Sequence, residues 1–212
     1  MLRDKVIERI ARQIAKHGKH TLLVGSPGTG KTRIALKARE YLGPPKEIRL
    51  LGKIREVYRA AGLNQPDSLE RPFRAPHHTV SRGAMLGRRP DPDTAFPYYG
   101  ELSLAHGGVL FLDELPEFHG SVLEDLQPAL VAKAVTHGTR TGNVTYPADF
   151  LLLAGMNHCP CGWRGYPGET KCVCTPEAVE RYMSRLKTRK GSWACSLYDM
   201  FEVFDLNEEL NE

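Results

Sequence analysis

GSPGTGKT, at residues 25–32, is the stretch of sequence that decides the fold. It fits the phosphate-loop pattern G-x-x-x-x-G-K-[ST], and it lies between an apolar run at residues 21–24 and a segment with helical spacing at residues 31–42. In such a loop the glycines let backbone N–H groups curl around phosphate oxygens, and the helix N-terminus adds its positive dipole end. We therefore expect a nucleotide-binding loop made of Gly25, Ser26, Pro27, Gly28, Thr29, Gly30, Lys31 and Thr32.

The chemistry of the loop is carried by its last two residues and by a second apolar run. Lys31 is expected to reach the β- and γ-phosphates of ATP, and Thr32 to place its hydroxyl on Mg²⁺. Residues 109–112 are continuously apolar, which is typical of a parallel strand buried on both faces. Asp113 follows this run and can hold Mg²⁺ through water, whereas Glu114 is suited to polarise an attacking water or, alternatively, to cap a helix.

A third apolar run, at residues 150–156, ends at Asn157. If its strand lies beside the other two, the Asn157 amide can orient the water or touch the γ-phosphate, and otherwise it is a turn residue. Alternating strands and helices predict an α/β fold with a mostly parallel sheet. The expected helices lie at residues 6–15, 31–42, 54–61 and 121–133, and the expected strands at 21–24, 48–51, 109–112 and 150–154. A hairpin is expected at 134–146, an irregular inserted loop region at 71–100, and a frayed acidic tail at 207–212.

Composition excludes several classes of protein. The chain has 212 residues, of which 41% are hydrophobic, and a net charge of only +4, so we expect one folded domain and no extensive disorder. The longest apolar run is too short to cross a bilayer, and the charged N-terminal segment does not have the apolar core of a secretory signal. A cytoplasmic protein with no membrane partner is therefore expected.

The small net charge hides a division along the chain. Residues 1–90 hold 20 Lys and Arg against 7 Asp and Glu, which leaves 9 against 18 for residues 91–212. Mixed solvated faces, a polyanionic ligand for the basic half, and association between unlike faces all explain this division. The arginines at 71, 74, 82, 88 and 89, together with His137 and Arg140 in the hairpin, are candidates to face DNA phosphates, unless they are only solvated loop surface. His77 and His78, expected to point in different directions on a strand, fit a packing or loop-orienting role better than a metal site.

Four cysteines form a compact pattern, Cys159-x-Cys161 and Cys172-x-Cys174. Four thiolates at this spacing can hold a structural Zn²⁺ in a knuckle at residues 159–174. The C-x-C spacing is tighter than the common C-x₂-C, so free thiols in a turn and a redox role stay open as alternatives. Cys195 is left over and is expected only to fill space.

These motifs together resemble those of the AAA+ ATPases, and more specifically the ComM and magnesium-chelatase-like branch. The strings that carry the resemblance are RPFRAPHH (71–78), GELSLAHGGVLFLDELPEF (100–118), YPADF (146–150), MN (156–157), CPCG (159–162) and RYMSRL (181–186). The similarity runs from about Ala11 to about Val203. It implies a P-loop ATPase core over residues 1–206, with a five-stranded sheet and inserted hairpins, that binds ATP or ADP with Mg²⁺ and assembles into a ring, usually a hexamer.

The resemblance to the two branches of this family implies two different functions. ComM-like members are associated with DNA branch migration, whereas chelatase members drive Mg²⁺ insertion into a porphyrin. The strings PHH and CPCG are more similar to the ComM side. We therefore expect an ATPase that remodels DNA or a DNA–protein complex, with a chelatase-type motor subunit as a further alternative.

Three departures from the family pattern bear on turnover. The large domain that ComM proteins carry before this core, and the α-helical lid that follows it, fall outside the 212 residues. The arginine that would act on a neighbouring subunit's γ-phosphate falls on Met200, which leaves Arg185 and Arg189 as candidates to replace it. An alternative expectation is therefore a nucleotide-binding assembly module with little turnover, which completes its site in a ring with a full-length relative.

Overall fold

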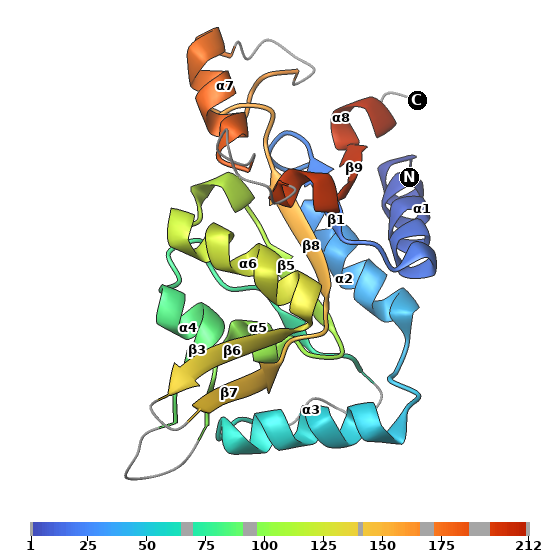
Figure 1. Cartoon of the computed structure of the whole chain (residues 1–212). Helices are drawn as coiled ribbons and strands as arrows, with labels where there is room; N and C mark the ends of the chain where they lie inside the picture. Colours follow the sequence, from blue (N-terminus) through green and yellow to red (C-terminus); the bar gives the residue numbers. More distant parts are fainter. Residues whose placement is uncertain are drawn as a thin grey trace.

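The computed structural model describes residues 2–64, 70–90, 97–139, 142–165, 172–186 and 196–210. Its centre is a five-stranded sheet with the order β2-β5-β8-β1-β9, in which every neighbouring pair is parallel (Figure 1). The strands are β1 (Thr21–Val24), β2 (Phe73–Arg74), β5 (Val109–Leu112), β8 (Leu151–Met156) and β9 (Glu202–Asp205). The predicted α/β fold with a mostly parallel five-stranded sheet is thus confirmed.

The central strands are apolar throughout because helices cover both faces of the sheet. Val109 and Phe111 of β5 point to the face that carries α1 (Leu2–His17) and α2 (Lys31–Leu42). That side contains a cluster in which Ile10, Ile14 and Ile34 are almost fully buried. Successive side chains of a strand point to opposite faces, so a strand buried on both faces must be apolar at every position.

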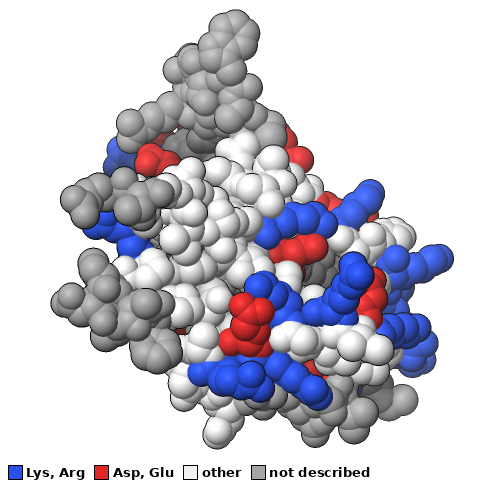
Figure 2. All heavy atoms as spheres, turned by 60° about the horizontal axis from the view of Figure 1, so that its bottom comes forward, with Lys and Arg blue, Asp and Glu red and all other residues white. Residues whose placement is uncertain are grey.

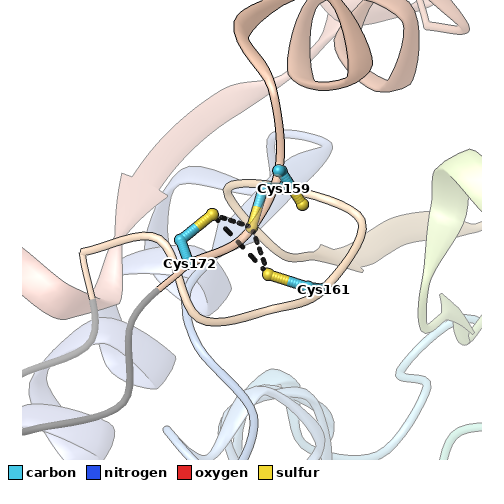
Figure 3. Close-up of side chains that lie close together, drawn as sticks. Cys159, Cys161 and Cys172 are labelled. Carbon is cyan, nitrogen blue, oxygen red and sulfur yellow. Dashed lines mark hydrogen bonds between the residues drawn. The ribbon is translucent and has the colours of Figure 1, made fainter.

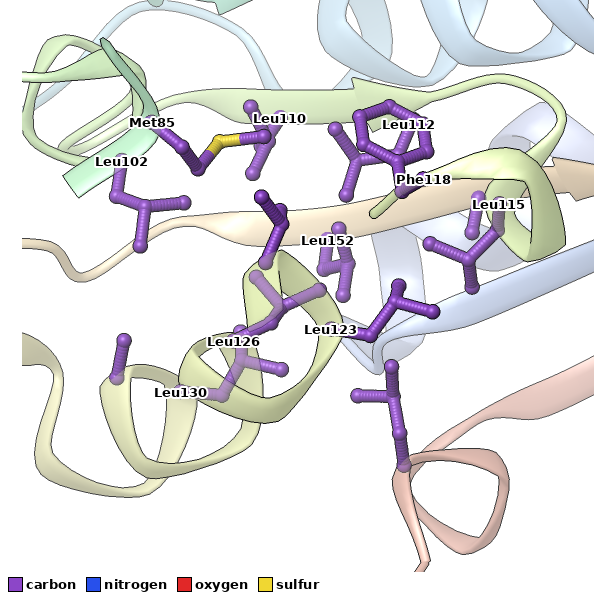
Figure 4. Close-up of a cluster of buried hydrophobic side chains, with 14 of the residues drawn as sticks. Met85, Leu102, Leu110, Leu112, Leu115, Phe118, Leu123, Leu126, Leu130 and Leu152 are labelled. Carbon is purple, nitrogen blue, oxygen red and sulfur yellow. The ribbon is translucent and has the colours of Figure 1, made fainter. Parts of the chain in front are cut away.

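The opposite face of the sheet is covered by α6 (Gly120–Ala132). Figure 4 shows Leu123, Leu126 and Leu130 of this helix directed at Leu110 of β5 and Leu152 of β8. The spacing of three and four residues places these leucines on one side of the helix. Burying each leucine contributes roughly 1.5–3 kcal/mol, so this core holds the strand ends, and the loops that follow them, in place.

The remaining elements lie around the edge formed by β2. The helices there are α3 (Ile48–Ala60), α4 (Arg82–Leu86) and α5 (Glu101–Leu104). Two antiparallel strand pairs lie beside them: β3 (Gly87–Arg88) with β4 (Tyr98–Tyr99), and β6 (Ala134–Thr139) with β7 (Gly142–Pro147). The two pairs touch, because the Tyr146 hydroxyl donates to the Arg88 carbonyl at 2.9 Å and its ring contacts Tyr99. The predicted hairpin is confirmed; Arg140 at its tip lies outside the described residues.

The C-terminal part of the chain adds short elements near the sheet edge formed by β9. They are α7 (Pro176–Ser184), η2 (Leu197–Met200) and α8 (Leu206–Glu209), whereas η1 (Leu115–Glu117) follows β5, which β8 and β1 separate from β9. No helix in the described part of the chain has the length and apolar character needed to cross a membrane.

Three expectations about secondary structure were wrong. Residues 48–51 begin α3 and are not a strand, because Leu50, Ile54 and Val57 share one helix face that packs against Leu104. The region 71–100 is not only loop, since it supplies the edge strand β2 and the short elements α4, β3 and β4. The tail is not frayed over its described part, since residues 206–209 form α8 and Asn207 is 9% exposed.

Two half-buried histidines make the stability of this fold depend on pH. Nδ1 of His20 accepts a hydrogen bond from the backbone N–H of Leu152, and Nδ1 of His106 accepts one from Asp149, both at 3.1 Å. Burial lowers the pKa of both imidazoles below the ordinary value of 6.5. In mildly acidic solution the unfolded chain therefore binds more protons than the native chain. The free energy of unfolding is thus highest, as far as these two histidines are concerned, above about pH 6.5, and it falls as the pH is lowered.

We therefore expect urea denaturation to give a lower free energy of unfolding at about pH 5 than at about pH 7.5. His20→Gln and His106→Gln keep a hydrogen-bond acceptor that does not titrate, so each variant should flatten this dependence. A pH dependence that is equally steep in the wild type and in the His20→Gln, His106→Gln double variant would contradict this account.

Candidate nucleotide-binding site

Three neighbouring strands bring the predicted site residues to one edge of the sheet. β8 lies between β1 and β5, with Val24 opposite Met156 and Leu112 opposite Ala154. The strands are parallel, so the loops that follow them all leave from the same edge, where ligands bind in open α/β sheets. The loop at 25–32, the pair Asp113 and Glu114, and Asn157 are therefore neighbours, although they are far apart in the sequence.

Lys31 is the centre of this arrangement. Its ammonium nitrogen donates to the Gly25 carbonyl at 2.7 Å, to the Ser26 carbonyl at 3.3 Å and to Oδ1 of Asn157 at 3.2 Å. Burial lowers the pKa of Lys31, and the negative charges of Asp113 and Glu114 act in the opposite direction. An ammonium group offers three donors, and here all three meet neutral oxygens, so the buried positive charge has no bonded anion among the described residues.

The backbone of the loop has the conformation that its glycines allow. Gly28 and Gly30 have φ angles of +80° and +103°, in the left-handed region that side chains rarely adopt. A Cβ at Gly30 would also lie 2.9 Å from the side chain of Ile7 in α1. Thr29 is buried, and its hydroxyl donates to the Ser26 carbonyl at 2.9 Å, whereas Thr32 is exposed in the first turn of α2. The hydroxyl of Thr32 is thus open to solvent at the mouth of the loop.

The two carboxylates after β5 have different surroundings. Asp113 lies over Gly155 of β8, where a Cβ would clash with its Oδ1, and this oxygen accepts the backbone N–H of Glu114 at 3.0 Å. Glu114 is exposed and has a φ of +53°, a conformation that is strained for a residue with a side chain. Its Oε2 is 3.6 Å from Nε2 of His78. Backbone strain of this kind is concentrated at functional sites, where it fixes the direction of a side chain.

His78 was missed as a site residue by the sequence analysis. His77 and His78 do not lie on a strand and do not point apart: they lie in a turn, with ring centroids 4.0 Å from one another. The contact of His78 with Glu114 joins positions 36 residues apart, and no local pattern predicts it. The His78 ring also contacts Phe118 edge-on, in keeping with the expected packing role, and the structure adds a place beside the candidate base.

A second group of residues, also missed, braces the loop from the side of β9. Asn207 Oδ1 accepts the Ser26 backbone N–H at 3.1 Å, and its Nδ2 donates to Ser26 Oγ and to the Gly165 carbonyl, both at 3.0 Å. The Tyr182 hydroxyl accepts the Asn157 backbone N–H at 3.4 Å, and burial raises the pKa of Tyr182 to about 12. His158 pairs with Asp205 of β9 at 2.6 Å. These contacts fix both the loop and the Asn157 backbone.

Most of the predicted DNA-facing arginines have partners within the protein. Arg71 donates to the carbonyls of Gly43 and Gly107, and Arg74 forms a two-pronged ion pair with Glu101 at 2.6 and 2.7 Å. Arg82 pairs in the same way with Asp125. The guanidinium of Arg88 lies over the ring of Tyr98. Arg71 and Arg74 are thus occupied by partners within the fold, whereas Arg82 is paired at the surface, and contact of this set with a phosphate backbone stays a prediction.

The candidate positions for a trans-acting arginine also have definite places. Met200 lies in η2 and packs against the α6 side of the core. Arg185 donates to the Phe118 carbonyl at 3.1 Å and lies 3.5 Å from Glu117, so it contacts the short helix that follows Glu114. Arg189 is outside the described residues. In this structure Arg185 therefore contacts η1 of its own chain.

The four cysteines also meet. Their ligand atoms all lie within 4.8 Å of one another, and the cluster directly follows Asn157 in the chain. The segment between the two Cys-x-Cys pairs is described up to residue 165, and residues 166–171 are outside the described ranges. The cluster is therefore part of the surroundings of the nucleotide site and is not a separate appendage.

Comparison with known proteins agrees with this geometry. The family model for magnesium chelatase, subunit ChlI, matches residues 2–189. The chain is 40% identical to the uncharacterized protein YifB of Salmonella typhimurium over 177 residues, and 38% identical to the competence protein ComM of Haemophilus influenzae over 178 residues. These matches cover 81% and 83% of this chain and 33% of each relative. The chain thus spans about a third of the length of the curated relatives it matches.

Solved structures show the same fold at low identity. NtrX from Brucella abortus in complex with ADP superimposes with a TM-score of 0.51 at 16% identity, covering 88% of this chain and 34% of that one. NtrX in complex with ATP gives a TM-score of 0.50 over 86% of this chain and 35% of that one. At such identity the likeness is one of fold. The family match over most of its length shows that the chain belongs to the magnesium chelatase subunit ChlI family, as a ComM-like AAA+ protein with an ATP-binding core.

Proposed function

We propose that this chain binds Mg·ATP at residues 25–32 and hydrolyses it, as the ATPase core of a ring that remodels DNA or a DNA–protein complex. The observation that carries the proposal is the buried ammonium of Lys31, whose three acceptors are all neutral oxygens. A buried charge without an opposite charge is costly, so the site favours an anion that can take the place of those oxygens. A triphosphate cradled by the loop N–H groups supplies that anion.

The residues present fit a magnesium ion beside the phosphates. The exposed hydroxyl of Thr32 and the Asp113 carboxylate are hard oxygen ligands at the same edge of the sheet. Mg²⁺ held there would neutralise charge on the β- and γ-phosphate oxygens. Asp113 is fixed for this task by the hydrogen bond that it accepts from the Glu114 backbone and by its place over Gly155.

Glu114 is the proposed base of hydrolysis. It accepts a proton from the attacking water, the γ-phosphoryl group passes to the oxygen of that water, and ADP leaves. His78, 3.6 Å from the carboxylate, can hold the side chain in place until substrate binds. Asn157 is the proposed sensor: its amide oxygen now bonds Lys31, and a γ-phosphate that draws the ammonium away would free the amide to hold the water or the phosphate.

The proposed DNA surface also includes α3. Arg49, Arg55 and Arg59 of this helix are exposed, and none of them forms an ion pair with another described residue. Figure 2 shows the face that carries this helix, where Lys and Arg side chains are spread widely and Asp and Glu lie among them. Arginines that are free of internal partners can neutralise backbone phosphates, which gives salt-dependent binding without base readout.

A second candidate function is a nucleotide-binding assembly module with little turnover of its own. It is favoured by the position of Met200, which packs into the core where a trans-acting arginine is expected. Losing such an arginine can cost about 10³–10⁵ in rate. In this case a partner subunit would have to supply the missing charge.

The ATPase rate per chain, measured over a wide range of protein concentration, separates the two functions. We expect the rate per chain to rise steeply with concentration, because a site completed by a neighbour exists only in the assembled ring. Size measurement with and without ATP should show assembly over the same range. A rate that stays negligible at every concentration, while nucleotide still binds, would overturn hydrolysis by this chain alone and support the assembly module.

A further inference from the structure

We infer that the four cysteines hold a Zn²⁺ ion, and that this metal site braces the nucleotide loop. Sγ of Cys159 lies 3.4 Å from Sγ of Cys161 and 3.6 Å from Sγ of Cys172, and the Cys161 and Cys172 sulfurs are also 3.6 Å apart. Figure 3 shows the side chains of these three residues directed at a common point. With Cys174, all four ligand atoms lie within 4.8 Å of one another.

These separations are those of ligands around one small ion. A Zn–S bond of about 2.3 Å in tetrahedral geometry places the sulfurs about 3.8 Å apart. The observed distances are close to this value and are far longer than the roughly 2.05 Å of a disulfide bond. A cluster of several iron atoms would divide the four thiolates among two or more irons and would spread the set of four sulfurs further apart. On binding, the thiols lose their protons to solvent and the thiolates coordinate the metal.

The local backbone also has the form of a metal-binding knuckle. The Gly162 N–H donates to the Cys159 carbonyl at 3.0 Å, which closes a tight turn between the first two ligands. Gly162 has a φ of +81°, which a residue with a side chain rarely adopts. The turn brings Cys159 and Cys161 to the same side, where Cys172 and Cys174 meet them from beyond the loop.

This knuckle lies directly against the nucleotide site. A Cβ at Gly162 would be 3.0 and 3.1 Å from the ring carbons of Pro27 and 3.5 Å from Nδ2 of Asn157. The carbonyl of Gly165, in the same loop, accepts a hydrogen bond from Asn207, which in turn binds Ser26. The knuckle therefore touches the loop at Pro27 and, through Asn207, at Ser26. It also lies next to the proposed sensor.

Such contacts couple the two ligands. If zinc orders the knuckle in the position that supports Pro27 and Asn157, loss of zinc must weaken nucleotide binding, and bound nucleotide must strengthen zinc binding by the same factor. This second part of the inference rests on the proposed nucleotide function, whereas the metal site itself does not.

The metal site is tested on the purified chain without nucleotide. We expect emission spectrometry to find a single zinc ion per chain, and Co²⁺ substitution to give the visible absorption of a tetrahedral tetrathiolate site. Cys161→Ser and Cys172→Ser should each lose the metal, whereas Cys195→Ser, the matched control at the fifth cysteine, should keep it. Absence of stoichiometric metal, or iron in place of zinc, would overturn the site, and the Co²⁺ spectrum decides even if a cysteine variant fails to fold.

The coupling is tested by titrating ADP into the zinc-loaded chain and into the chain after chelation. We expect chelation to weaken ADP binding by at least about fivefold, and ADP to tighten zinc binding equally. Gly162→Ala keeps all four ligands, but the left-handed backbone resists a side chain and the added methyl presses on Pro27, so it should weaken ADP binding by roughly tenfold and weaken zinc binding as well.

The two proposals fail in different ways. Zinc without ADP binding would refute the nucleotide function and leave the metal site standing. ADP binding without zinc would do the reverse. If both ligands bind and neither changes the affinity of the other, the proposed coupling between the zinc site and the nucleotide loop is wrong.

Discussion

Lys31→Ala is expected to abolish nucleotide binding, with affinity for ADP and ATP lowered by at least about 100-fold. The reason is the position of the ammonium group at the junction of three strand ends, where burial has removed most of its water and lowered its pKa. A hydrogen bond to a charged group is worth roughly 1.5–3 kcal/mol, and Lys31 is placed to make more than one such bond to phosphate. Isothermal titration of the purified variant with ADP and with ATP measures the loss.

The matched control is Lys37→Ala, two turns further along the same helix. Lys37 is paired at the surface with Glu40 at 2.7 Å, so its removal takes a positive charge from α2 without touching the loop. We expect unchanged nucleotide affinity for this variant. Thermal denaturation of both variants separates loss of binding from loss of folding. Wild-type affinity in a folded Lys31→Ala protein would contradict the assignment of the site.

The residues that sequence predicted well are those whose signal is local. The glycines at 28 and 30 fix a left-handed loop backbone, and continuous apolar runs mark strands buried on both faces. Asp113, Glu114 and Asn157 follow such runs directly. Because the three strands are parallel and adjacent, the residues that follow them meet at one edge of the sheet. For this reason Asn157 lies beside Lys31, as expected.

What could not be predicted depends on contacts between distant parts of the chain. Asn207 braces Ser26 across 181 residues, and its segment resembled a frayed acidic tail because charge and position in the chain were the only signals. The short strand β2 has only two residues, which is too short for any periodicity. The ion pairs of Arg74 and Arg82 could not be predicted either, because their partners Glu101 and Asp125 lie on other elements.

A glycine in β8 carries a local signal of its own. Gly155 is a glycine inside an otherwise apolar strand, which often marks a site where another group approaches closely. The structure shows that group to be Asp113, whose carboxylate occupies the space that a side chain at 155 would need. The glycine therefore predicts the proximity of β8 to the proposed magnesium ligand.

Glu114→Gln is expected to keep nucleotide binding and to lower the ATPase rate by about 10²–10⁴. Glutamine has the same shape and can still occupy the strained backbone position and approach His78, but it cannot accept a proton from water at neutral pH. Removing a negative charge from the neighbourhood of the phosphates should leave ATP affinity equal or slightly tighter. The rates are compared at a protein concentration at which the wild type turns over.

The matched control is Glu117→Gln, in the short helix that starts one residue after Glu114. Glu117 lies 3.5 Å from Arg185, so its neutralisation changes the charge of the same segment without removing the proposed base. A base at position 114 predicts a large loss in the first variant and a small change in the second. Equal loss in both would trace the effect to the packing of η1, and equal rates in Glu114→Gln and wild type would refute the base. Because a proton acceptor contributes to turnover and not to ground-state binding, only the pattern of retained affinity with lost rate supports Glu114 in this role.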